Sequence, residues 1–183
     1  SSSSETANYK ASVASRIIRE TLADKSADIS TESDESHSDV IRGRIADLTG
    51  GLGVDSLAFS LVAKNVLYNE MNPERAAAAK HNFALLGAAN IDVISHCVQP
   101  RKGLADDFWD TLTTFRPELI YMDPARRSTT GNKVFLLEDC SPDVLTLLSD
   151  LFRISVNLLL KLSPMADISM LITRLREHQG YVH

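Results

Sequence analysis

A glycine-rich turn is the first place in this chain where residue types and spacing could bind a ligand. The segment from Asp47 to Asp55 reads DLTGGLGVD and follows a short apolar run. Glycines 50, 51 and 53 allow a sharp turn and a close approach of a ligand to the backbone, because no Cβ stands in the way. The helix expected to start at Ser56 adds unpaired N–H groups at its first turn. The turn therefore predicts a nucleotide site, without saying which nucleotide.

Acidic residues at the ends of later strands narrow that choice. Glu70 ends the second predicted strand, where a carboxylate can accept hydrogen bonds from both hydroxyls of a ribose. The alternative is an exposed acid that caps the next helix together with Asn72. The position of Glu70 after a glycine-rich unit favours the ribose.

Two cofactors compete for this pattern. A dinucleotide site expects a third glycine where Ser56 stands, and a nicotinamide dehydrogenase has no use for Asp123-Pro124-Ala125-Arg126 at the end of the fourth strand. Enzymes that use S-adenosylmethionine use both a glycine-rich turn of this kind and a motif at the end of the fourth strand. The sequence therefore favours S-adenosylmethionine, and the dehydrogenase remains the alternative.

The ordered motifs resemble those of class I S-adenosylmethionine-dependent methyltransferases. They are DLTGGLGVD from Asp47, YNEMNP from Tyr68 and IYMDPAR from Ile120. The first is closest in form to bacterial ribosomal RNA guanine-N2 methyltransferases and is similar in style to cap trimethylguanosine synthases. The block also resembles bacterial methyltransferases that carry a THUMP-like RNA-binding domain after the catalytic one. The resemblance covers roughly residues 41–178.

This resemblance implies a role for each cofactor-binding position. Asp47 would contact the methionine end of the cofactor, Glu70 the ribose and Met71 the adenine. In the family an acid after the third strand reads the adenine amino group, but the matching residue here is Cys97, so a backbone group or Gln99 is an alternative. The expected cofactor-binding residues are Asp47, Thr49, Gly50, Gly51, Gly53, Asp55, Glu70, Met71, Cys97 and Val98.

The resemblance also implies the acceptor side. In amino-methylating enzymes the acid of this motif accepts hydrogen bonds from the target NH2, and Pro124 would fix the turn. Arg126 stands where those enzymes have an aromatic residue, and its plane can stack on a base or bind phosphate. The alternative is a solvated basic turn. The expected catalytic residues are Asp123, Pro124 and Arg126, and the expected substrate contacts are Arg126, Arg127 and Lys161; a strand-end lysine in solvent is the alternative for Lys161.

Alternating patterns predict the elements that position these residues. Apolar runs predict strands at 44–48, 66–69, 91–95, 119–122 and 156–161, and helical periodicity predicts helices at 8–24, 56–63, 73–86, 105–115, 142–152 and 166–178. Ser141 is expected to cap the helix at 142–152, and Gly87 to end the helix at 73–86.

Such alternation predicts a Rossmann-like, doubly wound α/β fold: a mainly parallel sheet between two layers of helices. Residues 1–40 are expected to form an N-terminal helix and a Ser/Asp/Glu-rich loop, and residues 41–183 the methyltransferase domain. The resemblance implies two further strands after His183, so we expect that edge of the sheet to be incomplete.

Composition limits the remaining choices. The chain is 44% hydrophobic and 23% charged, with a formal net charge of −5. No apolar run approaches the roughly 20 residues of a membrane span. Cys97 and Cys140 make no metal-ligand or redox pair at short spacing, which favours a reduced, cytoplasmic setting without a metal. The negative charge argues that a domain outside this chain helps to hold RNA.

The sequence as a whole predicts an S-adenosylmethionine-dependent methyltransferase that acts on an amino nitrogen of an RNA base, with guanine N2 favoured by the resemblance. Methylation of a protein or a small molecule is an alternative. A nucleotide-binding or interaction module without catalysis is another. No membrane partner is expected, and the oligomeric state is left open.

Overall fold

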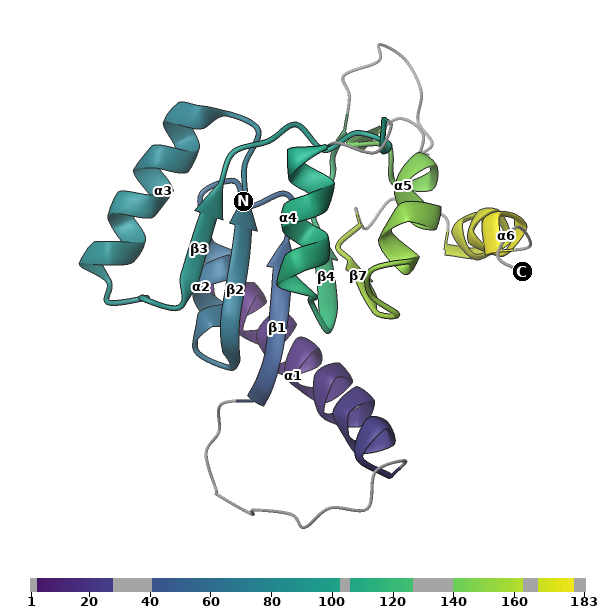
Figure 1. The fold of residues 1–183 in the computed structure, drawn as a ribbon, viewed down its shortest axis with the longest axis horizontal. Coiled ribbons are helices and arrows are strands. Elements are labelled where there is room, and N and C mark those ends of the chain that lie inside the picture. Colours follow the sequence, from purple (N-terminus) through teal and green to yellow (C-terminus); the bar gives the residue numbers. More distant parts are fainter. Residues whose placement is uncertain (1–2, 28–40, 103–105, 127–139, 163–167, 180–183) are drawn as a thin grey trace.

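A five-stranded parallel sheet forms the centre of the molecule. The computed structural model describes residues 3–27, 41–102, 106–126, 140–162 and 168–179. The strand order is β3-β2-β1-β4-β7, and every neighbouring pair is parallel (Figure 1). This order reverses direction between β1 and β4, which is the topological switch point of a doubly wound sheet. The predicted Rossmann-like α/β fold is confirmed.

The elements alternate along the chain as expected. The helices are α1 (Ser4–Ala27), α2 (Val54–Ser60), α3 (Pro73–Leu85), α4 (Asp107–Phe115), α5 (Val144–Phe152) and α6 (Ile168–Gln179). The strands of the main sheet are β1 (Ile41–Asp47), β2 (Ala63–Asn69), β3 (Ile91–Ile94), β4 (Leu119–Met122) and β7 (Leu158–Leu160). Two short strands, β5 (Ala125–Arg126) and β6 (Cys140–Ser141), pair antiparallel as a separate ribbon.

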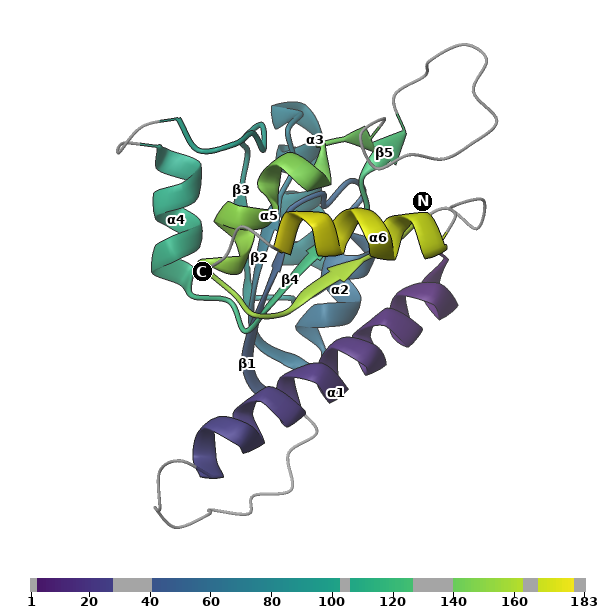
Figure 2. The ribbon, with the colours of Figure 1, turned by 90° about the vertical axis from the view of Figure 1, so that its right-hand side faces the viewer.

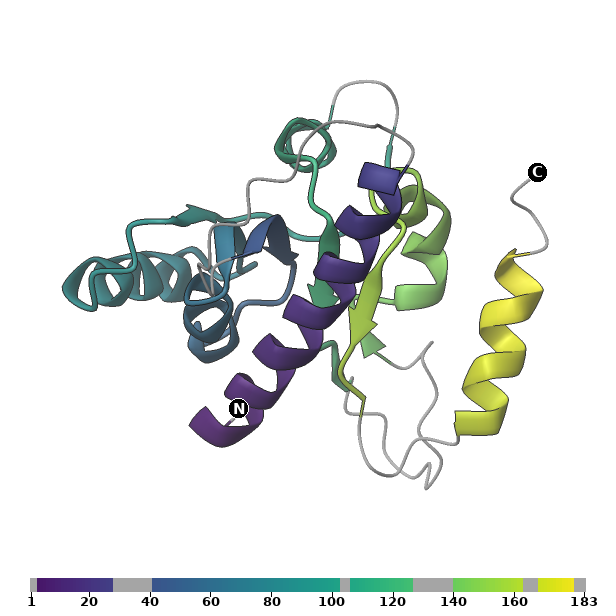
Figure 3. The same cartoon turned by 90° about the horizontal axis from the view of Figure 1, so that it is seen from below.

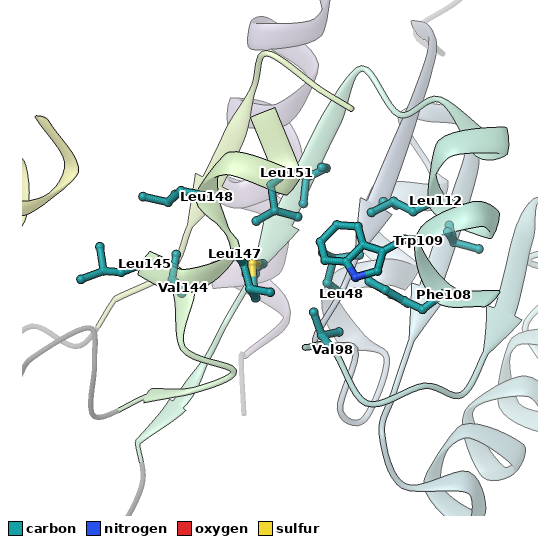
Figure 4. Close-up of a cluster of buried hydrophobic side chains, with 14 residues drawn as sticks. Leu48, Val98, Phe108, Trp109, Leu112, Val144, Leu145, Leu147, Leu148 and Leu151 are labelled. Carbon is teal, nitrogen blue, oxygen red and sulfur yellow. The ribbon is translucent and has the colours of Figure 1, made fainter. Parts of the chain in front are cut away.

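The alternation of side chains along each strand places hydrophobic clusters on both faces of the sheet. On one face Ile45 and Tyr121 pack with residues of α1 and α2. On the other, Ala46 and Ile120 pack against α4 and α5, around the buried Trp109 (Figure 4). Trp109 is therefore a core residue.

Helix α1 belongs to the packed structure. It lies across one face of the sheet beside α2, as Figures 2 and 3 show. Its buried stripe consists mostly of alanines, and Ile18 is the largest apolar side chain in that stripe. Ile17 and Leu22 are only partly buried. Small side chains let α1 lie close to the sheet.

Several predicted boundaries were wrong, and each for a local reason. Ser141 does not cap α5: it belongs to β6, and the carboxylate of Asp143 accepts the hydrogen bond from the N–H of Leu145 instead. Ala63, expected in a helix, begins β2. The segment after Asp123, for which no strand was predicted, starts with β5. Gly87 has the expected left-handed conformation, with φ of 72°.

Candidate functional site

A single open cavity lies at the carboxyl ends of the strands, where the strand order reverses. Its volume is about 430 Å³. The glycine turn, the end of β2, the segment after β3 and the end of β4 all contribute to its wall. The lining residues are Leu48, Thr49, Gly50, Gly51, Leu52, Val54, Asp55, Asn69, Glu70, Met71, Arg75, His96, Cys97, Val98, Asp123, Ala125, Ser141 and Pro142.

The glycine turn is held from below by Tyr68 on β2. The Tyr68 hydroxyl donates a hydrogen bond of 2.6 Å to the carbonyl oxygen of Gly51. A Cβ at Gly50 would lie 2.1 Å from the Tyr68 ring, and one at Gly53 would lie 2.5 Å from the ring of Phe83. Gly53 also has φ of +80°, a conformation that favours glycine. Two of the three glycines are therefore needed for packing under the turn.

Asp47 lies behind the turn and is not among the cavity-lining residues. Its Oδ2 accepts a 2.6 Å hydrogen bond from the Ser56 hydroxyl, and its Oδ1 accepts one of 3.1 Å from the N–H of Thr49. Burial is the main cause that raises the pKa of Asp47 from 3.8 to about 7. A glycine in place of Ser56 would remove one of these partners, which gives a physical reason for the serine. The contact of Asp47 with the methionine end stays a prediction.

Glu70 lines the cavity and holds the turn from the opposite side. Its Oε2 accepts a 3.0 Å hydrogen bond from the N–H of Gly51, and its Oε1 accepts one of 2.9 Å from the N–H of Asn72. Arg75 on α3 adds an ion pair of 3.2 Å, and the Glu70 side chain is 5% exposed. Glu70 therefore supports the start of α3 as a buried acid, not as the exposed one of the alternative, and it also faces the cavity. Its contact with a ribose stays a prediction.

The rim beyond Glu70 is more apolar and more open. Met71 and Cys97 are exposed, while Val98 is buried. Cys97 is an exposed free thiol, and Cys140 is a buried one. Gln99 donates a 3.5 Å hydrogen bond to the Cys97 sulfur but does not line the cavity. The structure therefore gives no support to Gln99 as the alternative contact for adenine.

Asn69 is a residue that the sequence did not single out. Its Nδ2 donates to the carbonyl oxygens of Leu48 and His96, and its Oδ1 accepts from the N–H of His96. It therefore fastens the segment after β3 to the segment after β1. A polar residue in the last, buried position of a strand is the signal that could have revealed it.

Asp123 and Lys161 meet at the opposite side of the cavity. Their strands are neighbours, with Met122 beside Leu160, so both side chains leave the same edge of the sheet. Lys161 Nζ lies 2.6 Å from Asp123 Oδ2, and the N–H of Asp123 donates a 2.6 Å hydrogen bond to the Thr49 hydroxyl. Thr49 thereby links the glycine turn to the acceptor side. Neither of the two readings of Lys161, phosphate contact or free strand end, anticipated this pair.

The other acceptor-side residues have different positions. Pro124 is buried and does not line the cavity. The backbone of Arg126 pairs with Cys140 in the β5–β6 ribbon, which brings Ser141 to the cavity wall. The side chain of Arg126 and the whole of Arg127 lie outside the described residues. Their expected roles stay predictions.

Asp55 is one of the cavity-lining residues, and its carboxylate has protein partners. Lys10 Nζ lies 2.6 Å from Asp55 Oδ2, and the Tyr121 hydroxyl donates a hydrogen bond of 2.8 Å to the same oxygen. The motifs contain Asp55 and Tyr121, but Lys10 lies outside them, so no sequence pattern predicts this cluster.

Two features of the described residues bear on other classes of function. Among them there is no group of three or more His, Cys, Asp and Glu residues that could hold a metal ion. No helix in the described ranges has the length and apolar character of a membrane span.

Comparison with known proteins places the fold among methyltransferases. A protein from Porphyromonas gingivalis W83, assigned as a methyltransferase, is 35% identical with a TM-score of 0.58 over 70% of this chain. The match covers 30% of that protein, so the present chain spans less than a third of its length. No family model and no curated protein matches the sequence.

Two further solved structures are similar at lower identity. One is a precorrin-6y C5,15-methyltransferase from Geobacter metallireducens GS-15, with 13% identity, a TM-score of 0.49 and coverage of 76% of this chain and 64% of the other. The other, assigned as an RNA methyltransferase, comes from Pyrococcus horikoshii, with 21% identity, a TM-score of 0.48 and coverage of 76% and 61%. The present chain has the Rossmann-like α/β fold of a methyltransferase, preceded by an N-terminal helix.

Proposed function

We propose that this chain is the catalytic domain of an S-adenosylmethionine-dependent methyltransferase that modifies an amino nitrogen of an RNA base. One observation carries the proposal: a single cavity at the switch point joins the glycine turn and Glu70 to Asp123. One side therefore offers partners for a nucleoside, and the other offers an acceptor carboxylate. The methyltransferase fold and the relative from Porphyromonas gingivalis support the reaction class.

The residues of the cavity fit this cofactor. Glu70 is ionisable, lines the wall and has lone pairs that ribose hydroxyls can share with its present donors. The exposed Met71 and the neighbouring Cys97 and Val98 provide an apolar rim for a flat adenine ring. Gly51 lines the cavity, and the absence of a Cβ there leaves this part of the turn open to the ligand.

S-adenosylmethionine supplies, when bound, a methyl group on a sulfonium that a nucleophile can attack in line. The chain itself contributes positioning and hydrogen-bond acceptors. Asp123 accepts hydrogen bonds from the target amino group, Lys161 orients the Asp123 carboxylate, and Thr49 fixes the Asp123 backbone relative to the turn. Pro124 holds the backbone that follows Asp123.

Guanine N2 in RNA is the favoured acceptor because of the motif resemblance. Arg126, Arg127 and Lys161 are the proposed substrate contacts within this chain. With a formal net charge of −5, the chain needs further basic surface to hold RNA tightly, and a domain outside it is the proposed source. The THUMP-like domain, the cytoplasmic location and the division at residue 40 are parts of this proposal.

Binding and transfer can be tested separately. Calorimetry should show binding of S-adenosylmethionine and of S-adenosylhomocysteine to the unmodified chain, and the absence of binding at millimolar ligand would overturn the proposal. Asp123→Ala should bind both ligands as the unmodified chain does, but should lose transfer of a labelled methyl group to RNA. Equal loss of binding and transfer would contradict the role of Asp123.

The acceptor is tested with a panel of substrates. Labelled S-adenosylmethionine is offered with total RNA, with a protein extract and with a small-molecule extract, and methylated nucleosides are identified after digestion. N2-methylguanosine is the expected product. Label in protein or small molecules alone would establish the alternative acceptors, and cofactor binding without any transfer would favour a non-catalytic module.

A further inference from the structure

A buried lysine on the N-terminal helix reaches the back of the cofactor site. The Lys10 side chain is 9% exposed, and the side chain of Asp55, which it contacts, is 10% exposed. Lys10 Nζ lies 2.6 Å from Asp55 Oδ2 and 3.1 Å from the Tyr121 hydroxyl. The Tyr121 hydroxyl in turn donates to Asp55 Oδ2 at 2.8 Å. Three elements, α1, α2 and β4, thus converge on one buried cluster.

The two partners of Lys10 lie next to the groups that face the ligand. Asp55 is in the first turn of α2 and belongs to the cavity wall, directly after the glycine turn. Tyr121 is on β4, two residues before Asp123. The cluster therefore connects the start of α2, on the cofactor side, with the end of β4, on the acceptor side.

Ordinary packing accounts for this cluster less well than a positioning role does. A buried ion pair is weak evidence for stability, since apolar residues of similar volume often serve as well. The rest of the buried stripe of α1, from Ala7 to Ile18, is apolar and already anchors the helix. By contrast, the contacts among Lys10, Asp55 and the Tyr121 hydroxyl fix the relative positions of these groups well. Each contact restricts direction as well as distance.

The same cluster sets the charge behind the turn. The negative charge of Asp55 raises the pKa of Asp47, and the positive charge of Lys10 lowers it. If the Lys10 ammonium were removed, the carboxyl groups of Asp47 and Asp55 would remain buried near each other without its positive charge. The start of α2 would then have to move or take up water, and the turn between Asp47 and Asp55 would move with it.

We propose that Lys10 is a positioning residue of the cofactor site. From α1 it holds Asp55 and Tyr121, and through them it sets the spacing between the start of α2 and the end of β4. The inference rests on the proposed function, since it concerns the affinity of the same cavity for S-adenosylmethionine. It makes α1 a working part of the site, although α1 does not line the cavity.

The test compares two α1 variants in the whole chain. Lys10→Met keeps the length of the side chain and removes the charge, while Ile18→Ala weakens α1 packing beside Gly43 without touching Asp55. Calorimetry with S-adenosylhomocysteine is done at a temperature at which circular dichroism shows each variant folded. We expect Lys10→Met to weaken binding at least tenfold and Ile18→Ala to change it less than twofold. Lys10→Arg should restore most of the affinity.

Hydrogen exchange gives a second readout. The amides of residues 49–55 should exchange faster in Lys10→Met than in Ile18→Ala. If Lys10→Met does not fold, Tyr121→Phe keeps the ring that packs edge-on against Phe59 and removes only the hydroxyl. That variant should bind threefold to tenfold more weakly.

The outcomes separate the inference from the proposed function. An affinity of folded Lys10→Met equal to that of the unmodified chain, or an equal loss in Ile18→Ala, would overturn the positioning role and leave the proposed function standing. For Tyr121→Phe, unchanged affinity would do the same. Failure of the unmodified chain to bind either ligand would overturn the proposed function and the inference together.

Discussion

The two sides of the cavity are built in different ways. On the cofactor side, Glu70 is 5% exposed and accepts hydrogen bonds from backbone N–H groups of the turn and of the next helix. On the acceptor side, Asp123 and Lys161 are 31% and 32% exposed and hold each other by a single ion pair. The cofactor side is therefore fixed before a ligand arrives, while the acceptor side can adjust to its substrate.

This difference indicates where specificity is set. Backbone donors and buried carboxylates cannot move without breaking several hydrogen bonds at once, so we expect the proposed cofactor side to select one ligand. A partly exposed ion pair is worth little in water and can open easily. We therefore expect substitutions on the cofactor side to have larger effects than substitutions on the acceptor side.

Gly53→Ala should have the largest effect. The variant forces a Cβ into the ring of Phe83 at φ of +80°, and together these penalties should lower the free energy of unfolding by about 3 kcal/mol. Chemical denaturation measures the loss. Gly87→Ala is the matched control, because Gly87 has φ of +72° and no atom within 4 Å of its added Cβ. It should cost about 1 kcal/mol and leave cofactor affinity unchanged. Equal losses in the free energy of unfolding for the two variants would show that backbone strain alone causes the destabilisation.

Glu70→Ala should have the next largest effect. It removes the acceptor for the N–H groups of Gly51 and Asn72 and the proposed ribose partner. Affinity for S-adenosylmethionine should fall about thirtyfold, which corresponds to about 2 kcal/mol. Calorimetry measures the change. Glu74→Ala, which changes an exposed acid in the first turn of α3, is the control and should bind normally. Binding by Glu70→Ala within threefold of the unmodified chain would refute the preorganised cofactor side.

The pKa of Asp47 predicts a smaller, pH-dependent effect. Burial raises this pKa from 3.8 to about 7, so the ionised fraction rises about tenfold between pH 6 and pH 8. A cationic sulfonium binds better near the ionised form, and affinity for S-adenosylmethionine should rise up to about tenfold over that range. Asp47→Asn should show no such rise. A flat profile in the unmodified chain would contradict the prediction.

The raised pKa of Asp47 also makes the folding stability depend on pH. Because the pKa of Asp47 is higher in the folded than in the unfolded chain, the folded chain keeps a proton that the unfolded chain has lost. The stability associated with this proton is present below pH 4 and is lost as the pH rises through about 7. The melting temperature of Asp47→Asn should therefore rise relative to that of the unmodified chain as the pH increases.

Lys161→Met should have the smallest effect of the four. It removes the partner of Asp123 but leaves the cofactor side intact, so turnover should fall about fivefold, as expected for an exposed pair worth about 1 kcal/mol. Cofactor affinity should stay within twofold. Steady-state methyl transfer measures the first and calorimetry the second. Arg153→Met breaks the exposed pair with Asp150 and serves as control. A larger loss of cofactor affinity than of turnover would remove the distinction between the two sides.

Much of the fold could be predicted because local patterns determine it. The strand Leu119–Met122 was predicted to the residue, since four apolar residues stand between polar neighbours. The start of α5 was not, because Ser141 looked like a cap while pairing with Ala125 withdrew it into a strand. Helix caps compete with tertiary pairing, and the sequence shows only one of the competitors.

The site could be predicted in part for a similar reason. Glu70 and Asp123 stand at strand ends, which topology alone brings to one edge of the sheet. The pairs Lys161–Asp123 and Lys10–Asp55 could not be predicted, because each requires the strand or helix order in space. Asp47 was expected in the cavity wall, but its position behind the turn depends on which way a strand-end side chain points.

The contacts of Lys10 also bear on the order of folding. They span 45 residues to Asp55 and 111 residues to Tyr121. The Lys10 ammonium can therefore contact both residues only after α2 and β4 are in place. Contacts between such distant residues close late, because the loop entropy must be overcome first. The docking of α1, the first helix of the chain, is therefore expected to be among the last steps of folding and to mark the completion of the sheet.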